Sequence, residues 1–206
     1  MFPSGRSSGN RDSLNTRIRQ RIIEASLNGS FEEAEQNLVH TNPEVRASAF
    51  TALGQAGRLD KRLIRVALSD THHQVRCALA NLGAINQAIP LNSLLTDEDP
   101  VVIEIACWAI GERGKTDRET MDALKDIVEN HDDSLCRESA VAALGAIGDS
   151  YALDSILKAN DDIATVRRRA VLALAPFDGP EVELAIEKAL SDRDWQVRQA
   201  AEDIST

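Results

Sequence analysis

The sequence is poor in the features that mark several common protein classes. Aromatic residues make up 3% of the chain, cysteine occurs 3 times, and no apolar run approaches the roughly 20 residues of a membrane-spanning helix. Strict alternation of apolar and polar residues, the pattern of a half-buried strand, is absent. The segment after Met1 lacks the apolar core of a secretory signal. These absences predict an all-helical protein with free thiols, no membrane span and a cytoplasmic location.

Basic residues are outnumbered by acidic ones. The chain of 206 residues has 23 Lys and Arg against 33 Asp and Glu, which gives a net charge of −10. A protein that binds nucleic acid or an anionic membrane through charge needs the opposite balance. The composition therefore argues against both partners and leaves a protein as the expected partner.

The first 29 residues differ in charge from the rest. They hold five arginines against Asp12 and Glu24, a balance of +3, so the remaining residues carry −13. Residues 1–12 are rich in Ser, Gly and Arg and are expected to form a disordered basic tail. Residues 13–28 show the apolar stripe of a helix. We expect this helix to cap the first repeat, and the alternative is a basic arm that docks on a partner.

One stretch recurs along the chain. It runs from Asn42 to Gly54 with the sequence NPEVRASAFTALG, and six copies can be aligned on one apolar position. The steps between these positions are 30, 27, 34, 30 and 31 residues, a period that is typical of a solenoid. The six aligned positions are Val45, Val75, Val102, Cys136, Val166 and Val197.

Each copy predicts an inner helix that follows a shorter outer helix. Asn42 and Asp99 are good N-cap residues, and Pro43 and Pro100 fit the first helical position, where a missing N–H costs nothing. Pro90 is expected to kink or shorten the third outer helix. The outer helices are predicted at Phe31–Val39, Asp60–Leu68, Gln87–Leu95, Arg118–Val128, Tyr151–Ala159 and Glu181–Leu190.

The recurring pattern of Asp or Asn, Pro, Val, Arg, Ala, Ala, Leu and Gly resembles the HEAT-like repeat, especially the short bacterial form first associated with phycobilisome lyases. The resemblance covers residues 31–206, with departures at Ile103 in place of arginine and Cys136 in place of valine. It implies an all-α, right-handed α-solenoid of about six helix pairs over residues 31–206, preceded by an extra helix at 13–28. Members of this family include scaffolds, adaptors and a few enzymes.

No constellation of residues predicts catalysis. His73 and Cys77 have the spacing of two metal ligands on one helix face, but no second pair accompanies them, so we expect no metal. None of the four histidines is followed by glutamate, the dipeptide that supplies iron ligands in HEAT-like hydroxylases. Phosphate-binding loops and nucleophile elbows are also absent. We therefore expect a non-enzyme without cofactors.

Five arginines at equivalent repeat positions are expected to form a structural ladder along the inner turns. Acids or amides precede most of them by four or six residues, and arginine pairs well with carboxylate through a bidentate fork. The arginines are Arg46, Arg76, Arg137, Arg167 and Arg198, and the expected partners are Asn42, Asp70, Asp133, Asp161, Asp192 and Asp194.

A partner-binding face is expected on the third inner helix and on the Arg168–Arg169 pair. On a helical wheel, Trp108 and Ile105 lie away from the buried stripe and are flanked by Glu104 and Glu112. Exposed Trp and Arg are enriched among binding hot spots. The alternative is that the loop around Pro90 or the loop at residues 112–117 folds over Trp108.

These observations predict a non-catalytic scaffold or adaptor that binds a partner protein on the concave face of the solenoid. A curved row of helices offers a large, rigid surface that loses little entropy on binding. Two alternatives remain: an accessory subunit of a lyase or maturation enzyme, and a nucleic-acid-binding or DNA-repair protein.

Overall fold

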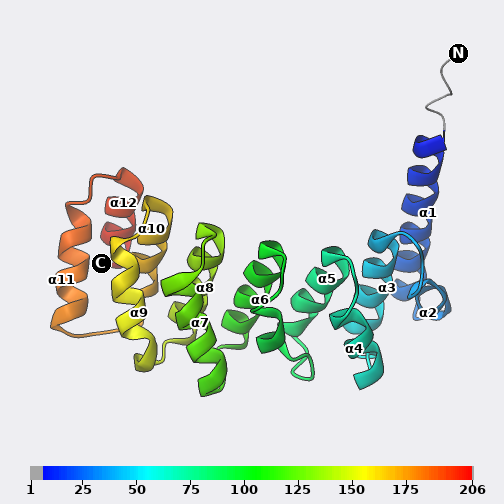
Figure 1. The fold of residues 1–206 in the computed structure, drawn as a ribbon, viewed down its shortest axis with the longest axis horizontal. Helices are drawn as coiled ribbons and strands as arrows, with labels where there is room; N and C mark the ends of the chain where they lie inside the picture. Colours follow the sequence, from blue (N-terminus) through cyan, green and yellow to red (C-terminus); the bar gives the residue numbers. More distant parts are fainter. Residues whose placement is uncertain (1–6, 206) are drawn as a thin grey trace, which may run out of the picture. The chain divides into compact units, whose positions relative to one another are not determined.

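The computed structural model describes residues 7–205, and over this range every regular element is a helix. The chain forms two compact units, Met1–Ile89 and Pro90–Thr206, which we call unit 1 and unit 2. Within the described range, no helix has the length and apolar character needed to cross a membrane. Figure 1 shows the helices of each unit packed side by side.

Unit 1 contains an N-terminal helix and two helix pairs. The helices are α1 (Ser7–Leu27), α2 (Glu32–Asn37), α3 (Pro43–Gln55), α4 (Lys61–Leu68) and α5 (His73–Gly83).

Unit 2 contains four helix pairs, some of whose outer members are short. The elements are η1 (Leu91–Leu94), α6 (Pro100–Arg113), α7 (Arg118–Asn130), α8 (Ser134–Ile147), η2 (Ser150–Ala152), α9 (Leu153–Lys158), η3 (Ala159–Asp161), α10 (Ala164–Ala173), α11 (Pro180–Leu190) and α12 (Trp195–Ile204).

The second member of each pair is the inner helix, and the inner helices pack on one another in a row. In unit 1, α1 packs on α3 and α3 packs on α5. In unit 2, α6 packs on α8, α8 on α10 and α10 on α12. The prediction of an all-helical repeat fold with six helix pairs and an extra N-terminal helix is confirmed.

Two predicted boundaries need correction. Helix α1 begins at Ser7, so residues 7–12, which were expected in a disordered tail, are helical; residues 1–6 of that tail lie outside the described residues. Ile18 and Ile22 in the middle of α1 are buried and hold the helix on the repeat. Once a helix has formed there, extending it toward Ser7 costs little per residue. The outer helix predicted at Gln87–Leu95 is a single 3₁₀ turn after Pro90, because proline lacks the N–H that a longer helix requires.

The predicted caps lie where the sequence placed them. Asn42 accepts a hydrogen bond from the backbone N–H of Val45, and Asp99 accepts one from that of Val101. Gly114 and Gly148 end α6 and α8 with φ of 65° and 67°, a left-handed conformation that glycine adopts without strain. These caps limit each helix to one repeat.

Small residues bring neighbouring inner helices close together. A Cβ atom built on Gly145 of α8 would lie 2.6 Å from Cβ and 2.7 Å from Cα of Ala173 on α10. Such distances are shorter than any van der Waals contact, so the two backbones can approach only because residue 145 has no side chain.

Arg46 joins the turns of two successive repeats in unit 1. Its Nε and Nη2 donate to the two carboxylate oxygens of Asp70, at 2.8 and 2.6 Å. Its Nη1 donates to the backbone carbonyl of His40 in its own repeat, also at 2.8 Å. Arg76 donates from Nη1 to the backbone carbonyl of Asp70, at 2.8 Å. Asp70 therefore receives arginine donors from both repeats.

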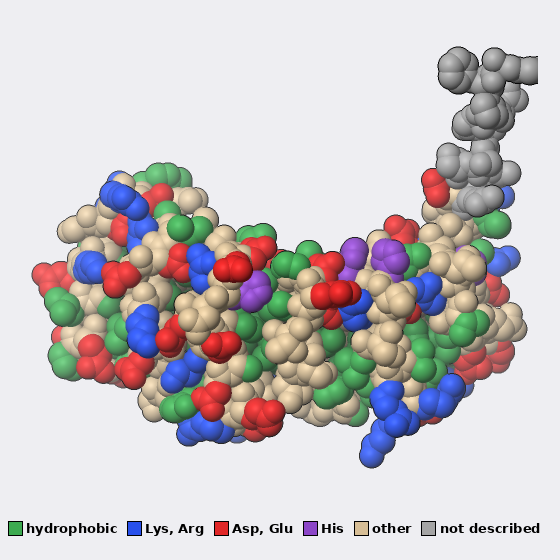
Figure 2. All heavy atoms as spheres, in the orientation of Figure 1, with side chains coloured by type: hydrophobic (Ala, Val, Ile, Leu, Met, Phe, Trp, Pro, Cys, Tyr) green, Lys and Arg blue, Asp and Glu red, His purple; other side chains and the backbone are tan. Residues whose placement is uncertain are grey.

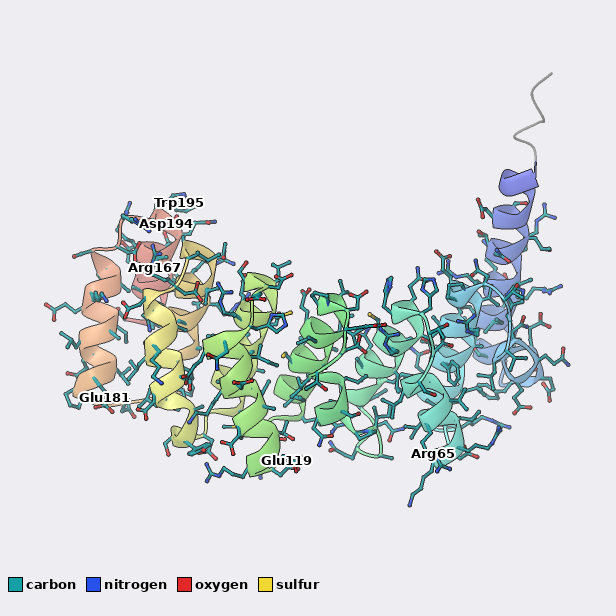
Figure 3. All side chains as sticks on the ribbon, viewed as in Figure 1. Arg65, Glu119, Arg167, Glu181, Asp194 and Trp195 are labelled. Atoms are coloured by element: carbon teal, nitrogen blue, oxygen red, sulfur yellow. The ribbon has the colours of Figure 1, made fainter. Side chains whose placement is uncertain are left out.

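The same arrangement recurs twice in unit 2. Arg137 holds Asp162 in a bidentate fork at 2.7 and 2.8 Å, and Arg167 holds Asp192 at 2.9 and 2.8 Å. Arg198 donates to the backbone carbonyl of Asp192, at 2.8 Å. Figure 3 shows Arg167 on α10 near the start of α12, to which the Asp192 turn leads.

The carboxylate partners differ from the expected ones. Each fork reaches an aspartate 24 or 25 residues further along the chain, in the turn of the following repeat, whereas we expected a residue shortly before the arginine. Residues at the expected positions have other roles. Asn42, Asp133 and Asp194 cap helices, and Asp161 bonds to Lys188. Spacing along one helix cannot reveal a contact that stacking creates.

The forks also set the charge state of the carboxylates. The guanidinium of Arg137 holds the pKa of Asp162 below its ordinary value, although burial opposes this shift. Arg167 lowers the pKa of Asp192 in the same way. A carboxyl whose pKa is lower in the folded state stabilises the fold above its unfolded pKa, and this stabilisation is lost as the pH falls through the folded pKa.

We predict that Gly145→Ala lowers the free energy of unfolding by about 1–3 kcal/mol, because the added methyl group meets the backbone of α10. Urea denaturation measures this loss. Gly54→Ala is the control, since the atoms nearest to its methyl group belong to the flexible side chain of Leu82, and we expect a smaller loss there. An equal loss at both positions would show that close backbone approach is not the cause.

We predict that Arg137→Ala and Asp162→Asn each lower the free energy of unfolding at pH 7 by roughly 1–3 kcal/mol, since each breaks a charged, part-buried hydrogen-bonded pair. Below about pH 4, near the unfolded pKa of aspartate, the wild type loses this contribution. The difference in free energy of unfolding between the wild type and Asp162→Asn then becomes smaller. Urea titrations from pH 7 to pH 3 test this. A difference in free energy of unfolding that stays constant with pH would contradict an ionic fork.

Candidate protein-binding face

Trp108 lies in the middle of α6 and its side chain is 48% exposed. The opposite side of the same helix is buried and includes Val102, Ala106 and Ile110. Neither the loop around Pro90 nor residues 112–117 therefore buries the indole. A large aromatic side chain is presented by a rigid, well-packed helix.

The other predicted residues of α6 surround Trp108 to different degrees. Glu112 is exposed, whereas Glu104 and Ile105 are half-buried. Ile105 is thus less accessible than expected, since a residue at the edge of the buried stripe is partly covered by the neighbouring helix. Val101 at the start of α6 is 49% exposed and extends the exposed apolar side of the helix that includes Trp108.

The adjacent helix α8 presents small side chains at the equivalent positions. Ser139 and Ala142 correspond in the repeat to Ile105 and Trp108 of α6. Both are half-buried, so they are reachable but project little from the helix. The side chains of Ser139 and Ala142 consequently project less far from their helix than Trp108 does on α6. They also project less far than Arg168 and Arg169 on α10.

Arg168 and Arg169 are only partly exposed and pair with a carboxylate of the neighbouring helix. Both approach the same carboxylate oxygen of Glu138 on α8, at 3.7 and 3.4 Å. The Nε atom of each is buried and has no hydrogen-bond partner. The three residues form a charged cluster with donor capacity to spare, because one carboxylate cannot satisfy two guanidinium groups.

Glu138 was not among the predicted site residues. It occupies the same repeat position as Glu104, and this alignment was the signal in the sequence that could have identified it. Its pairing with Arg168 and Arg169 depends on the stacking of α8 against α10, because the residues lie about 30 positions apart: Glu138 and Arg169 are separated by 31.

The structure brings the predicted binding residues onto one unit but not into one contact. Glu104, Ile105, Trp108 and Glu112 share α6, whereas Arg168 and Arg169 lie on α10 with α8 between them. The face can therefore offer a partner an apolar anchor at one end and hydrogen-bond donors at the other.

The candidate metal ligands stay apart within the described residues, and two of the three thiols are buried. Among residues 7–205, no three His, Cys, Asp or Glu side chains gather as metal ligands would, and the pair His73 and Cys77 stays without a third. Cys107 and Cys136 are buried, and burial raises the pKa of both thiols. A raised pKa disfavours the thiolate, which is the reactive form.

Comparison with known proteins agrees with the repeat architecture. Residues 87–174 match the family of HEAT repeats. No curated protein matches the chain.

Solved structures with similar folds include an engineered protein and a designed armadillo repeat protein. The first is 22% identical, with a TM-score of 0.55, and the match covers 85% of this chain and 96% of that one. The second is 20% identical, with a TM-score of 0.54, and the match covers 84% and 97%. At this identity the likeness concerns the fold alone, and the fold is that of a helical repeat protein.

The burial of the thiols predicts their order of reaction with a chromogenic disulfide reagent. In the native protein, Cys77, which is half-buried, reacts first, whereas Cys107 and Cys136 react only after unfolding. Cys77→Ser should abolish the fast phase and leave the two slow thiols. Two or three fast thiols in the native protein would show that the inner helices open readily.

Proposed function

We propose that this HEAT-like repeat protein is a non-catalytic scaffold or adaptor that holds a partner protein on the inner-helix face of unit 2. The observation that carries the proposal is Trp108, a half-exposed tryptophan in the middle of a packed helix. Tryptophan is strongly enriched among residues that dominate binding energy. A rigid helix also presents it with little ordering cost when the partner binds.

The charges of unit 2 support a protein partner with basic groups. Unit 2 has 12 Lys and Arg against 25 Asp and Glu, a net charge of −13. Acidic side chains are spread over the face of this unit that Figure 2 shows. A polyanion would be repelled, whereas a basic protein segment would be attracted and would associate faster.

The face itself favours a segment with mixed chemistry. An apolar side chain can pack on Trp108 and Val101, and basic groups can approach Glu104 and Glu112. A carboxylate on the partner can approach the guanidinium groups of Arg168 and Arg169, whose side chains are partly exposed. A partner that spans α6 to α10 would use both ends of the face.

The test is to capture the partner from the native host and then measure its affinity for purified variants. We expect Trp108→Ala to weaken binding by about 30-fold, which corresponds to roughly 2 kcal/mol. Its melting temperature should change little, because half of the indole is already in solvent.

Trp195→Ala is the matched control. Trp195, at the start of α12, is also exposed, at 64%, but lies outside the part of the face that α6, α8 and α10 form. We expect this variant to bind normally. Equal losses at both tryptophans, or unchanged capture by an unstable Trp108→Ala protein, would refute the proposed site. If the chain captures its partner from the host only when nucleic acid is present, the proposed partner class would be refuted.

A further inference from the structure

The outer helix α4 of unit 1 presents a patch of basic side chains. Lys61, Arg62 and Arg65 lie in its first five residues, and all three are exposed. They fall within about 100° of one another around the helix axis, because an α-helix turns by about 100° per residue. Figure 2 shows basic side chains projecting from this part of unit 1, and Figure 3 labels Arg65 on α4. We call these three residues the α4 patch.

The α4 patch has no partner among the described residues. None of its three side chains makes an ion pair, a hydrogen bond or a ring contact within residues 7–205. The basic residues of the other outer helices, in contrast, all have partners: Lys158 pairs with Glu129 at 2.9 Å, Lys188 pairs with Asp161 at 2.8 Å, and Arg118 and Lys125 lie over the ring of Tyr151. Exposed charge is common in this chain, but an unpaired basic cluster on an outer helix is peculiar to α4.

No acidic residue of α4 neutralises the patch. The helix has the sequence KRLIRVAL, whereas α2, α7, α9 and α11 each contain at least one Asp or Glu. An acid three or four residues away on the same helix would pair with the basic side chains. Asp60, just before α4, caps the helix and accepts the N–H of Leu63 at 2.7 Å. The positive charge of the patch is therefore available to a ligand.

The position of these charges does not serve the helix itself. Lys61 and Arg62 are its first two residues, at the end where the helix dipole is positive and where cations are unfavourable. The side chains that anchor α4 in the repeat are Ile64 and Ala67, which are buried. The helix dipole and the basic side chains both attract an anion to the start of α4.

The size of the patch favours a short acidic segment over a long polyanion. Double-stranded DNA carries one charge per about 1.7 Å and is held by a long row of cations, whereas α4 offers three. The outer helix of the preceding repeat, α2, carries three glutamates and would repel an anion that extends toward it. Arginine binds a carboxylate through a bidentate fork, and lysine adds a point charge. Two or three carboxylates close together match these donors.

We infer that the α4 patch is a binding site for a short acidic segment of a partner protein. Two or three Asp or Glu side chains of the segment pair with Lys61, Arg62 and Arg65. The site lies in unit 1, and its ligand is opposite in charge to the basic segment that unit 2 favours. It therefore goes beyond the function proposed for unit 2 and does not rest on it.

The probe is a phage-displayed library of random 12-residue peptides. It is selected on the full chain and counterselected on the triple variant Lys61→Glu, Arg62→Glu and Arg65→Glu. We expect the remaining peptides to carry runs of Asp and Glu. The triple variant should weaken a selected synthetic peptide at least tenfold in fluorescence anisotropy, and replacing the acids of the peptide by Asn or Gln should remove this difference. Its melting temperature should not fall, because glutamate suits the start of a helix.

The matched control makes the same change in net charge at three separate exposed positions. Its substitutions are Arg17→Glu, Lys115→Glu and Arg193→Glu. We expect this variant to weaken the peptide at most twofold. Equal losses in the two triple variants would show that only net charge matters. Lost binding together with a lower melting temperature in the α4 variant would show that the patch stabilises the fold. Either result would overturn the inference.

Two further measurements test the class of ligand. Duplex DNA that binds through the α4 patch more tightly than the selected peptides would assign the patch to nucleic acid. Sedimentation of the wild type would reveal a second copy as the ligand, if the chain self-associates and the α4 triple variant does not. Either outcome would overturn the inference of an acidic partner segment.

Discussion

The distance between neighbouring inner helices is the constraint on which the structure depends. Gly145 faces the backbone of Ala173 with no room for a side chain, and a Cβ atom on Gly111 would lie 3.1 Å from Cα of Ala143, closer than an ordinary contact. Close packing of this kind gives many dispersion contacts but leaves each interior narrow. The low aromatic content of the chain follows from this geometry, because a narrow interior has little space for rings.

The arginine forks complement this packing at the turns. Helix contacts fix the distance between repeats, and each fork fixes one turn against the next. In unit 2 the forks of Arg137 and Arg167 lie one repeat apart and use the same atoms. Each also bonds to backbone carbonyls of its own turn, so one side chain satisfies polar groups that stacking would otherwise bury.

The helix packing and the arginine forks lie inside the stack. The exposed positions of the inner helices are therefore free to vary. The repeat position of Trp108 holds alanine in α8 and leucine in α10, so each helix presents a different surface on the same backbone. The two units also differ in charge, +3 for unit 1 and −13 for unit 2. The same repeat fold therefore carries surfaces of opposite net charge in the two units.

The sequence by itself determined the helices, their caps and the number of repeats. These features depend on residues close together in the chain, such as Asn42, Pro43 and Val45, whose spacing shows which turn begins a helix and which side is buried. The exposure of Trp108 followed from the same helical periodicity. The short third outer helix followed only in part, because Pro90 shows where a helix fails but not what replaces it.

The tertiary structure decided which residues meet across repeats. The partner of Arg137 and the meeting of Glu138 with Arg168 and Arg169 each join residues about 25 or more positions apart. A one-residue change in the length of a turn would rotate the next helix and select a different neighbour. Local spacing contains no record of that rotation, so these contacts appear only when the helices are stacked.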